Sequence, residues 1–175
     1  MSLSETTMRS FGEYKSFRLS IPSPTILHIE LLTTSTNSMT KQFWDDLIEL
    51  FTKIKNDKNI RVVIFSSANT EIFTSGLDLN DHSELIHLSN VESDVGRKSI
   101  ELSKYIEKYQ SAFTLLQEIP QPVIMCIDQK CIGGGVNMIT AADIRICTKQ
   151  AYFQVAEINI GSVNIHHFII VNWDF

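Results

Sequence analysis

Two short runs of apolar, largely β-branched residues constrain the fold more than any other feature of this sequence. They cover residues 60–65 (IRVVIF) and 123–127 (VIMCI). Polar residues or proline bound both runs, which is typical of strands buried on both faces in a mainly parallel sheet. Parallel strands need a crossover connection, and a helix usually supplies it. The sequence therefore predicts an α/β fold in which strands and helices alternate.

Helical patterns occur between and after these runs. Thr40 can cap a helix in which apolar residues recur at three- and four-residue spacing over residues 43–54. A longer apolar stripe covers residues 102–116, and Pro120 ends it. A short helix is expected over residues 136–142, directly after three consecutive glycines.

Shorter strands and one polar stretch complete the predicted organisation. Strands are expected at residues 17–21, 26–32, 144–147 and 152–155. Residues 81–96 are polar and aperiodic, so they predict a loop. No internal repeat or linker divides the 175 residues, and one domain is expected.

Composition argues against several classes of function. The 15 Lys and Arg against 20 Asp and Glu give a net charge of -5, without a basic face for nucleic acid. No apolar run reaches the ~18 residues of a membrane span, and no hydrophobic signal core begins the chain. Cys126, Cys131 and Cys147 lack the spacing of a zinc site, so we interpret them as reduced core thiols and expect no metal.

The glycines are concentrated in two turns. The chain has 7 glycines, and four of them are Gly76 and the triplet Gly133, Gly134 and Gly135. An isolated glycine triplet is typical of a tightly packed turn. Neither the phosphate-loop pattern nor the dinucleotide pattern is present. Two glycine turns that each follow a strand can instead direct one backbone amide each at a shared oxygen, the arrangement called an oxyanion hole.

Four motifs, in this order, resemble those of the enoyl-CoA hydratase/isomerase, or crotonase, family. They are FTSGLDL at 73–79, PQPVI at 120–124, CIGGGV at 131–136 and ADIR at 142–145. Within that family, the first and third motifs and FQVAE at 153–157 resemble the dienoyl-CoA isomerases. The similarity covers about residues 12–161. It implies a crotonase-like (ClpP/crotonase) spiral of strand-strand-helix units.

The resemblance also implies a substrate and a site. The substrate is an acyl-CoA thioester, with no cofactor beyond the coenzyme A that it carries. The amides of Leu77 and Gly134 form the oxyanion hole, and Glu157 moves the proton. The site residues around them are Ser75, Gly76, Asp78, Gly133 and Asn137. Members form homo-trimers or hexamers in mitochondria or peroxisomes.

Three departures from the family pattern qualify these expectations. Where the dienoyl-CoA isomerases carry two further aspartates, this chain has Asn137 and Ile165. An asparagine forms hydrogen bonds but does not exchange a proton as an acid. Residues 162–175 no longer resemble the family, so we expect a divergent tail and a fold that is incomplete at the C-terminus. Trimer contacts are doubtful for such a chain.

These observations leave more than one function open. The first is an isomerase of fatty-acid β-oxidation that converts 3,5-dienoyl-CoA to 2,4-dienoyl-CoA with Glu157 as the proton shuttle. The alternatives are a truncated, catalytically impaired acyl-CoA-binding remnant and a single-acid 3-enoyl-CoA isomerase. We expect this chain to have little dienoyl-CoA isomerase activity, because that reaction exchanges protons at two separated carbons.

Overall fold

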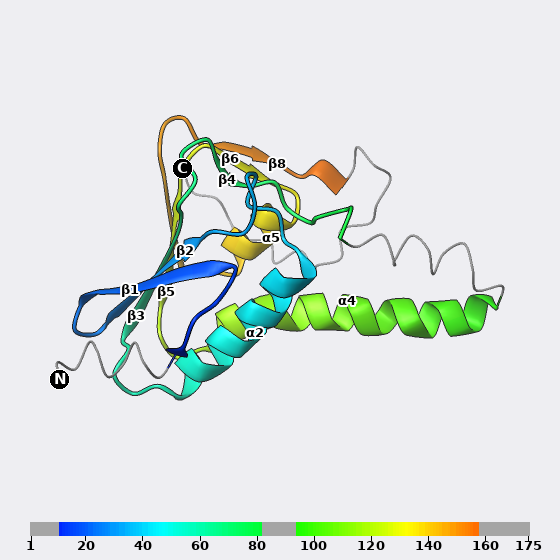
Figure 1. Ribbon diagram of the computed structural model, residues 1–175, viewed down its shortest axis with the longest axis horizontal. Helices are drawn as coiled ribbons and strands as arrows, with labels where there is room; N and C mark the ends of the chain where they lie inside the picture. The colour runs from blue at the N-terminus through cyan, green and yellow to red at the C-terminus, as the bar shows by residue number, and fades with distance from the viewer. Residues whose placement is uncertain (1–10, 82–93, 158–175) are drawn as a thin grey trace.

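The computed structural model describes residues 11–81 and 94–157, and it has the predicted α/β class (Figure 1). The elements along the chain are β1 (Phe17–Ser23), β2 (Ile26–Leu31), α2 (Lys41–Asn56), β3 (Val62–Ser67), β4 (Ile72–Thr74), α4 (Val95–Glu118), β5 (Val123–Ile127), β6 (Lys130–Ile132), α5 (Gly134–Thr140), β7 (Ile144–Cys147) and β8 (Tyr152–Gln154). None of the helices in these ranges is both long and apolar enough to cross a bilayer.

The strands form two sheets. A five-stranded sheet has the order β1-β2-β3-β5-β7, and a three-stranded sheet has the order β4-β6-β8. Only the β1-β2 pair is antiparallel among the registered strand pairs, and the others are parallel. The sequence prediction missed β4 and β6. Each has only three residues, too few to show the alternation that marks a strand.

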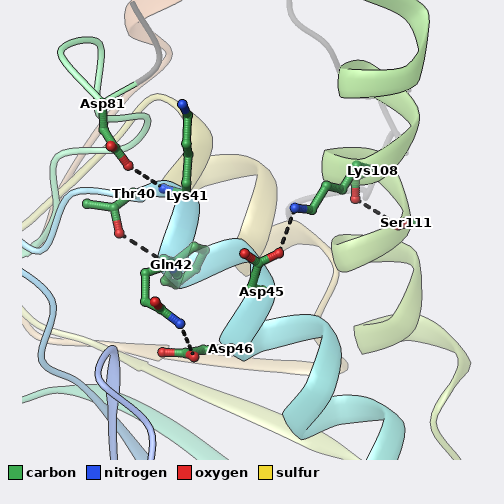
Figure 2. A network of polar contacts seen from close by, with 9 residues as sticks. Thr40, Lys41, Gln42, Asp45, Asp46, Asp81, Lys108 and Ser111 are labelled. Carbon is green, nitrogen blue, oxygen red and sulfur yellow. Dashed lines mark hydrogen bonds and ion pairs between the residues drawn. The ribbon is translucent and has the colours of Figure 1, made fainter. Parts of the chain in front are cut away.

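Helix α2 begins where the sequence predicts. The hydroxyl of Thr40 accepts a hydrogen bond from the Phe43 amide at 3.2 Å, which satisfies one of the free amides of the first turn. Figure 2 shows this cap together with an ion pair of 2.6 Å between Lys108 of α4 and Asp45 of α2. Both charged side chains are about half exposed, so the pair adds little stability, and packing between the two helices matters more.

The core lies between one face of the larger sheet and helices α2 and α4. The Trp44 ring stacks on Tyr109 with centroids 4.6 Å apart, which joins the two helices. Phe17 of β1 packs edge-on against Phe43 of α2 and Phe65 of β3. These rings are buried and close-packed, and they hold the helices to the sheet.

The expectation that β3 and β5 are buried on both faces was wrong within the described residues. Val63 and Phe65 of β3 are fully buried, whereas Val62 and Ile64 are only partly buried. The same alternation occurs in β5. The large helices pack on the face that carries Val63 and Phe65, so the side chains that point the other way keep solvent contact.

Helix α5 also differs from its prediction. It begins at Gly134, inside the glycine triplet, and ends at Thr140, two residues earlier than expected at each end. Gly133 precedes it with a φ of 53°. The helix therefore starts at the end of β6, in the smaller sheet, and this start places it beside the turn that follows β4.

Candidate active site

The two glycine turns lie side by side. Gly76 follows β4, Gly133 follows β6, and these strands are hydrogen-bonded neighbours. Gly76 has a φ of 81°, and a Cβ placed on it would lie 2.6 Å from the Ile132 oxygen and 3.0 Å from the Gly134 nitrogen. Both atoms belong to the backbone and have little room to move. A side chain at position 76 would therefore force the two turns apart.

The backbone around Leu77 places its amide nitrogen near the second turn. Met39 donates from its amide to the Gly76 oxygen at 2.7 Å, and the Asp78 amide donates to the Met39 oxygen at 3.2 Å. The Gly76 carbonyl and the Leu77 N–H belong to one trans peptide group, in which the C=O and the N–H point in opposite directions, so the Leu77 N–H points away from Met39. The Leu77 nitrogen lies 3.8 Å from the position that a Cβ on Gly134 would occupy. No described residue accepts a hydrogen bond from the Leu77 N–H.

Gly134 supplies the second free amide. It is the first residue of α5, and amides of a first helical turn have no partner within the helix. The next glycine, Gly135, has a packing role, because a Cβ there would overlap Cγ2 of Thr74 and lie 3.1 Å from the Cys131 sulfur. The triplet therefore brings α5 against β4 while the Gly134 amide stays near Leu77.

Glu157 lies directly beside the glycine triplet. Its Oε1 is 3.3 Å from the position of a Cβ on Gly133. The Gly133 amide donates to the Gln154 oxygen at 2.8 Å, which joins this turn to the end of β8 and so to Glu157. The Oε2 atom of Glu157 is buried and has no hydrogen-bond partner among the described residues. Buried polar atoms without partners are rare, and a functional site is one of the accepted reasons for them.

The remaining predicted site residues are placed as follows. Ser75 donates its hydroxyl to Thr36 Oγ1 at 3.2 Å. Asp78 accepts from Ser38 Oγ at 2.7 Å and from the amides of Asn80 and Asp81, so its carboxylate folds its own loop. The Asp81 carboxylate in turn accepts from the first amide of α2, as Figure 2 shows.

Two predicted departures concern acids. Asn137 lies in α5, within one helical turn of Gly134, and it is partly buried. Its backbone oxygen accepts from the Thr140 hydroxyl at 2.7 Å. Ile165, where the resemblance implies an aspartate, is outside the described residues.

A groove lies away from the glycine turns. A groove of about 990 Å³ lies at the amino-terminal ends of β3 and β5, and Lys55, Arg61 and Gln121 are among the residues that line it. It contains none of the glycine-turn residues. We place the chemistry at the turns, because two free amides and the buried, unpartnered Oε2 atom of Glu157 lie there, whereas the groove is wide and open to solvent. A shared cavity for the Leu77 and Gly134 amides stays a prediction.

The metal-ligating and thiol side chains of the described residues are placed as follows. No group of three or more His, Cys, Asp or Glu side chains there could hold a metal ion. Burial raises the pKa of the Cys131 thiol to about 12, so it stays protonated at neutral pH. The interpretation of all three cysteines as core thiols was wrong for Cys147, which is exposed.

The comparison with known families decides where the chain belongs. Residues 23–171 match the model of the enoyl-CoA hydratase/isomerase family. This chain belongs to the enoyl-CoA hydratase/isomerase family. The member described here is 41% identical over 149 residues to the mitochondrial Delta(3,5)-Delta(2,4)-dienoyl-CoA isomerase of Rattus norvegicus, across 85% of this chain and 45% of the relative. It is 32% identical to the peroxisomal isomerase of that name from Arabidopsis thaliana, across 90% and 56% of the two chains.

Solved structures support the crotonase-like fold of this family member. An enoyl-CoA hydratase structure from Geobacillus kaustophilus matches with a TM-score of 0.73 and 21% identity, over 88% of this chain and 54% of that one. An enoyl-CoA hydratase/carnithine racemase structure from Magnetospirillum magneticum matches with a TM-score of 0.70 and 26% identity, over 88% and 54%. This enoyl-CoA hydratase/isomerase family member therefore spans about half the length of the relatives it matches.

Sequence reasoning missed the loop that supports the site in this family member. Residues 34–39 hydrogen-bond to the segment that carries Leu77, through Met39 and Asn37 in particular. The sequence predicted no role for Asn37. Asn37 has a positive φ of 49°, a left-handed backbone conformation that asparagine tolerates. Its hydrogen bonds to residues distant in the chain leave no pattern in the local sequence, so the sequence could not reveal them.

Proposed function

We propose that this chain binds an unsaturated acyl-CoA thioester and moves its double bond through an enolate. One observation carries the proposal: the free amides of Leu77 and Gly134 lie at adjoining turns, with the unpaired Glu157 carboxylate beside the same triplet. Two fixed donors stabilise the charge that develops on a thioester oxygen when the neighbouring carbon loses a proton. A carboxylate next to them supplies the base.

The steps balance with one acid. The Glu157 carboxylate removes a proton from C2 of a 3-enoyl thioester, and the electron pair of that C–H bond delocalises onto the thioester oxygen. The oxyanion accepts hydrogen bonds from Leu77 and Gly134. The protonated Glu157 then returns the proton to C4, and the double bond moves from C3–C4 to C2–C3. No oxidant, metal or further cofactor takes part in this sequence.

The names of the relatives support a reaction in which the proton moves over a longer distance, from C2 to C6 instead of from C2 to C4. They are dienoyl-CoA isomerases, and we propose the corresponding conversion of 3,5-dienoyl-CoA to 2,4-dienoyl-CoA within fatty-acid β-oxidation, in mitochondria or peroxisomes. In that reaction the proton leaves C2 and returns at C6. Asn137 favours the shorter shift as a second candidate, because its amide does not deliver a proton to the distant carbon.

The test follows both products with the wild-type chain and a Glu157→Gln variant. Conjugation of the 2,4-diene with the thioester carbonyl gives 2,4-dienoyl-CoA an ultraviolet band that the 3,5-diene lacks, and a coupled hydratase assay detects 2-enoyl-CoA. We expect turnover of 3-enoyl-CoA that exceeds turnover of 3,5-dienoyl-CoA. Loss of the base should lower kcat by about 10²–10⁴-fold. Glu71→Gln changes an exposed residue before β4 and is the matched control. It should leave the turnover of both substrates unchanged.

Three results would separate the candidates. Turnover that survives Glu157→Gln would remove Glu157 from the mechanism. Binding of acyl-CoA without turnover of either substrate would support the impaired binding remnant. Dienoyl-CoA turnover equal to that of the full-length relatives would show that a single acid is sufficient for the longer shift.

A further inference from the structure

Asn37 is a buried residue whose side chain forms hydrogen bonds within its own loop and to β3 and β4. The residue is 2% exposed. It has no catalytic role in the proposed mechanism. Its Nδ2 donates to the Ser67 hydroxyl at 2.8 Å and to the Phe73 oxygen at 3.2 Å. Its Oδ1 accepts from the Thr33 amide at 3.3 Å. Asn37 therefore joins its own loop to the ends of β3 and β4.

The backbone of Asn37 continues this connection toward Leu77. Its oxygen accepts from the Thr74 hydroxyl at 2.6 Å, and the same hydroxyl accepts from the Gly76 amide at 3.1 Å. Two residues after Asn37, Met39 forms the bonds that flank Leu77. The hydrogen bonds of the Gly76 oxygen and the Asp78 amide, which flank the Leu77 N–H, therefore come from the loop that Asn37 holds in place.

Few residue types meet the requirements at this position. The φ of 49° is a left-handed conformation that glycine and asparagine adopt readily. The site also needs one donor toward Phe73 and one acceptor for Thr33 in a short side chain. Asparagine provides both, whereas aspartate lacks the donor and glycine lacks both groups.

We propose that Asn37 is a positioning residue that keeps the Leu77 amide aimed at the Gly133–Gly134 turn, an inference that rests on the proposed function for its catalytic consequence. A donor contributes to an oxyanion hole only when it lies within hydrogen-bond distance of the developing oxyanion. Loss of the Asn37 bonds frees the Phe73–Leu77 segment to shift. The thioester then binds, but its charged transition state loses one donor.

The test compares Asn37→Asp and Asn37→Gly in the full chain. Both keep the left-handed backbone accessible, and Asn37→Asp also keeps the shape of the side chain while it sets an oxygen against the Phe73 oxygen. Gln121→Glu is the matched control, because Gln121 is also buried and donates to two backbone oxygens, those of Ile54 and Asp57, at the far end of the sheet.

The readouts are kcat and KM for 3-enoyl-CoA and the amide resonance of Leu77 in the unliganded protein. We expect both Asn37 variants to lower kcat by about tenfold or more with KM changed less than about threefold. The Leu77 resonance should move in both variants. Neither kcat nor the resonance should change in Gln121→Glu.

Each other outcome has a defined meaning. An unmoved Leu77 resonance, or an equal loss of kcat in Gln121→Glu, would overturn the assignment. A wild-type chain without turnover would count against the proposed function alone, and the Leu77 resonance would then decide the role of Asn37. If both Asn37 variants fail to fold, Thr74→Val removes the hydroxyl between Asn37 and Gly76 and is judged by the same resonance.

Discussion

Gly76→Ala tests whether contact between the two glycine turns governs both stability and catalysis. The φ of 81° at Gly76 costs an alanine about 1–2 kcal/mol. The new Cβ would also lie 2.6 Å from the Ile132 oxygen, a separation that real side chains essentially never show. Relief of such overpacking typically costs a further 1–3 kcal/mol, roughly. The reduced entropy of the unfolded chain offsets about 0.4–1 kcal/mol of this sum, so we expect a loss of about 1–4.6 kcal/mol in the free energy of unfolding.

Gly12→Ala is an internal control for this estimate. Gly12 has a nearly identical φ of 80°, but a Cβ there would have no neighbour within 4 Å. Only the backbone strain remains, and the reduced entropy of the unfolded chain offsets about 0.4–1 kcal/mol of it. The control should lose about 1.6 kcal/mol or less. The difference between the two variants isolates the contact between Gly76 and Ile132.

Two measurements decide the prediction. Urea unfolding gives the free energies, and turnover of 3-enoyl-CoA gives kcat at a temperature where both variants are folded. Gly76→Ala should lower kcat by about 10²–10³-fold, because the Leu77 amide moves away from Gly134, whereas Gly12→Ala should leave kcat unchanged. The reasoning is refuted if the two variants are equally stable, or if Gly76→Ala keeps the wild-type kcat.

Three further outcomes follow from the same geometry. Asn137→Asp alone should not raise 3,5-dienoyl-CoA turnover above about twofold, because one added acid still leaves the other implied acid absent; a larger rise in the ultraviolet dienoyl assay would contradict this. Gly135→Ala should destabilise the fold by about 1–3 kcal/mol in urea unfolding, and Thr74→Ser should recover part of that loss by removing the overlapped methyl, so additive losses would disprove the contact. The free energy of unfolding should fall by up to about 1.4 kcal/mol per pH unit as the pH rises from 9.0 to about 12, since the unfolded Cys131 thiol ionises there while the folded one stays neutral. Cys131→Ala should remove that part of the slope, and an unchanged slope would argue against a buried neutral thiol.

The local pattern of the sequence determined the helices and the longer strands. The three- and four-residue spacing of apolar side chains predicted α2 and α4, because one face of each helix must leave water. The runs at 60–65 and 123–127 predicted β3 and β5. Glycine placement also predicted both turns, since a positive φ at Gly76 and Gly133 favours that residue type.

Only the tertiary structure decided how these pieces meet. The short strands β4 and β6 are stabilised by pairing with each other rather than by any pattern of their own, and this pairing brings Gly76 against Ile132. One-sided burial of β3 depends on which face the helices cover. The role of Asn37 depends on Phe73 and Ser67, which lie far along the chain. Periodicity reports which face of an element is buried, but a contact between distant segments is determined by the packing of the whole domain, and so the sequence alone did not reveal it.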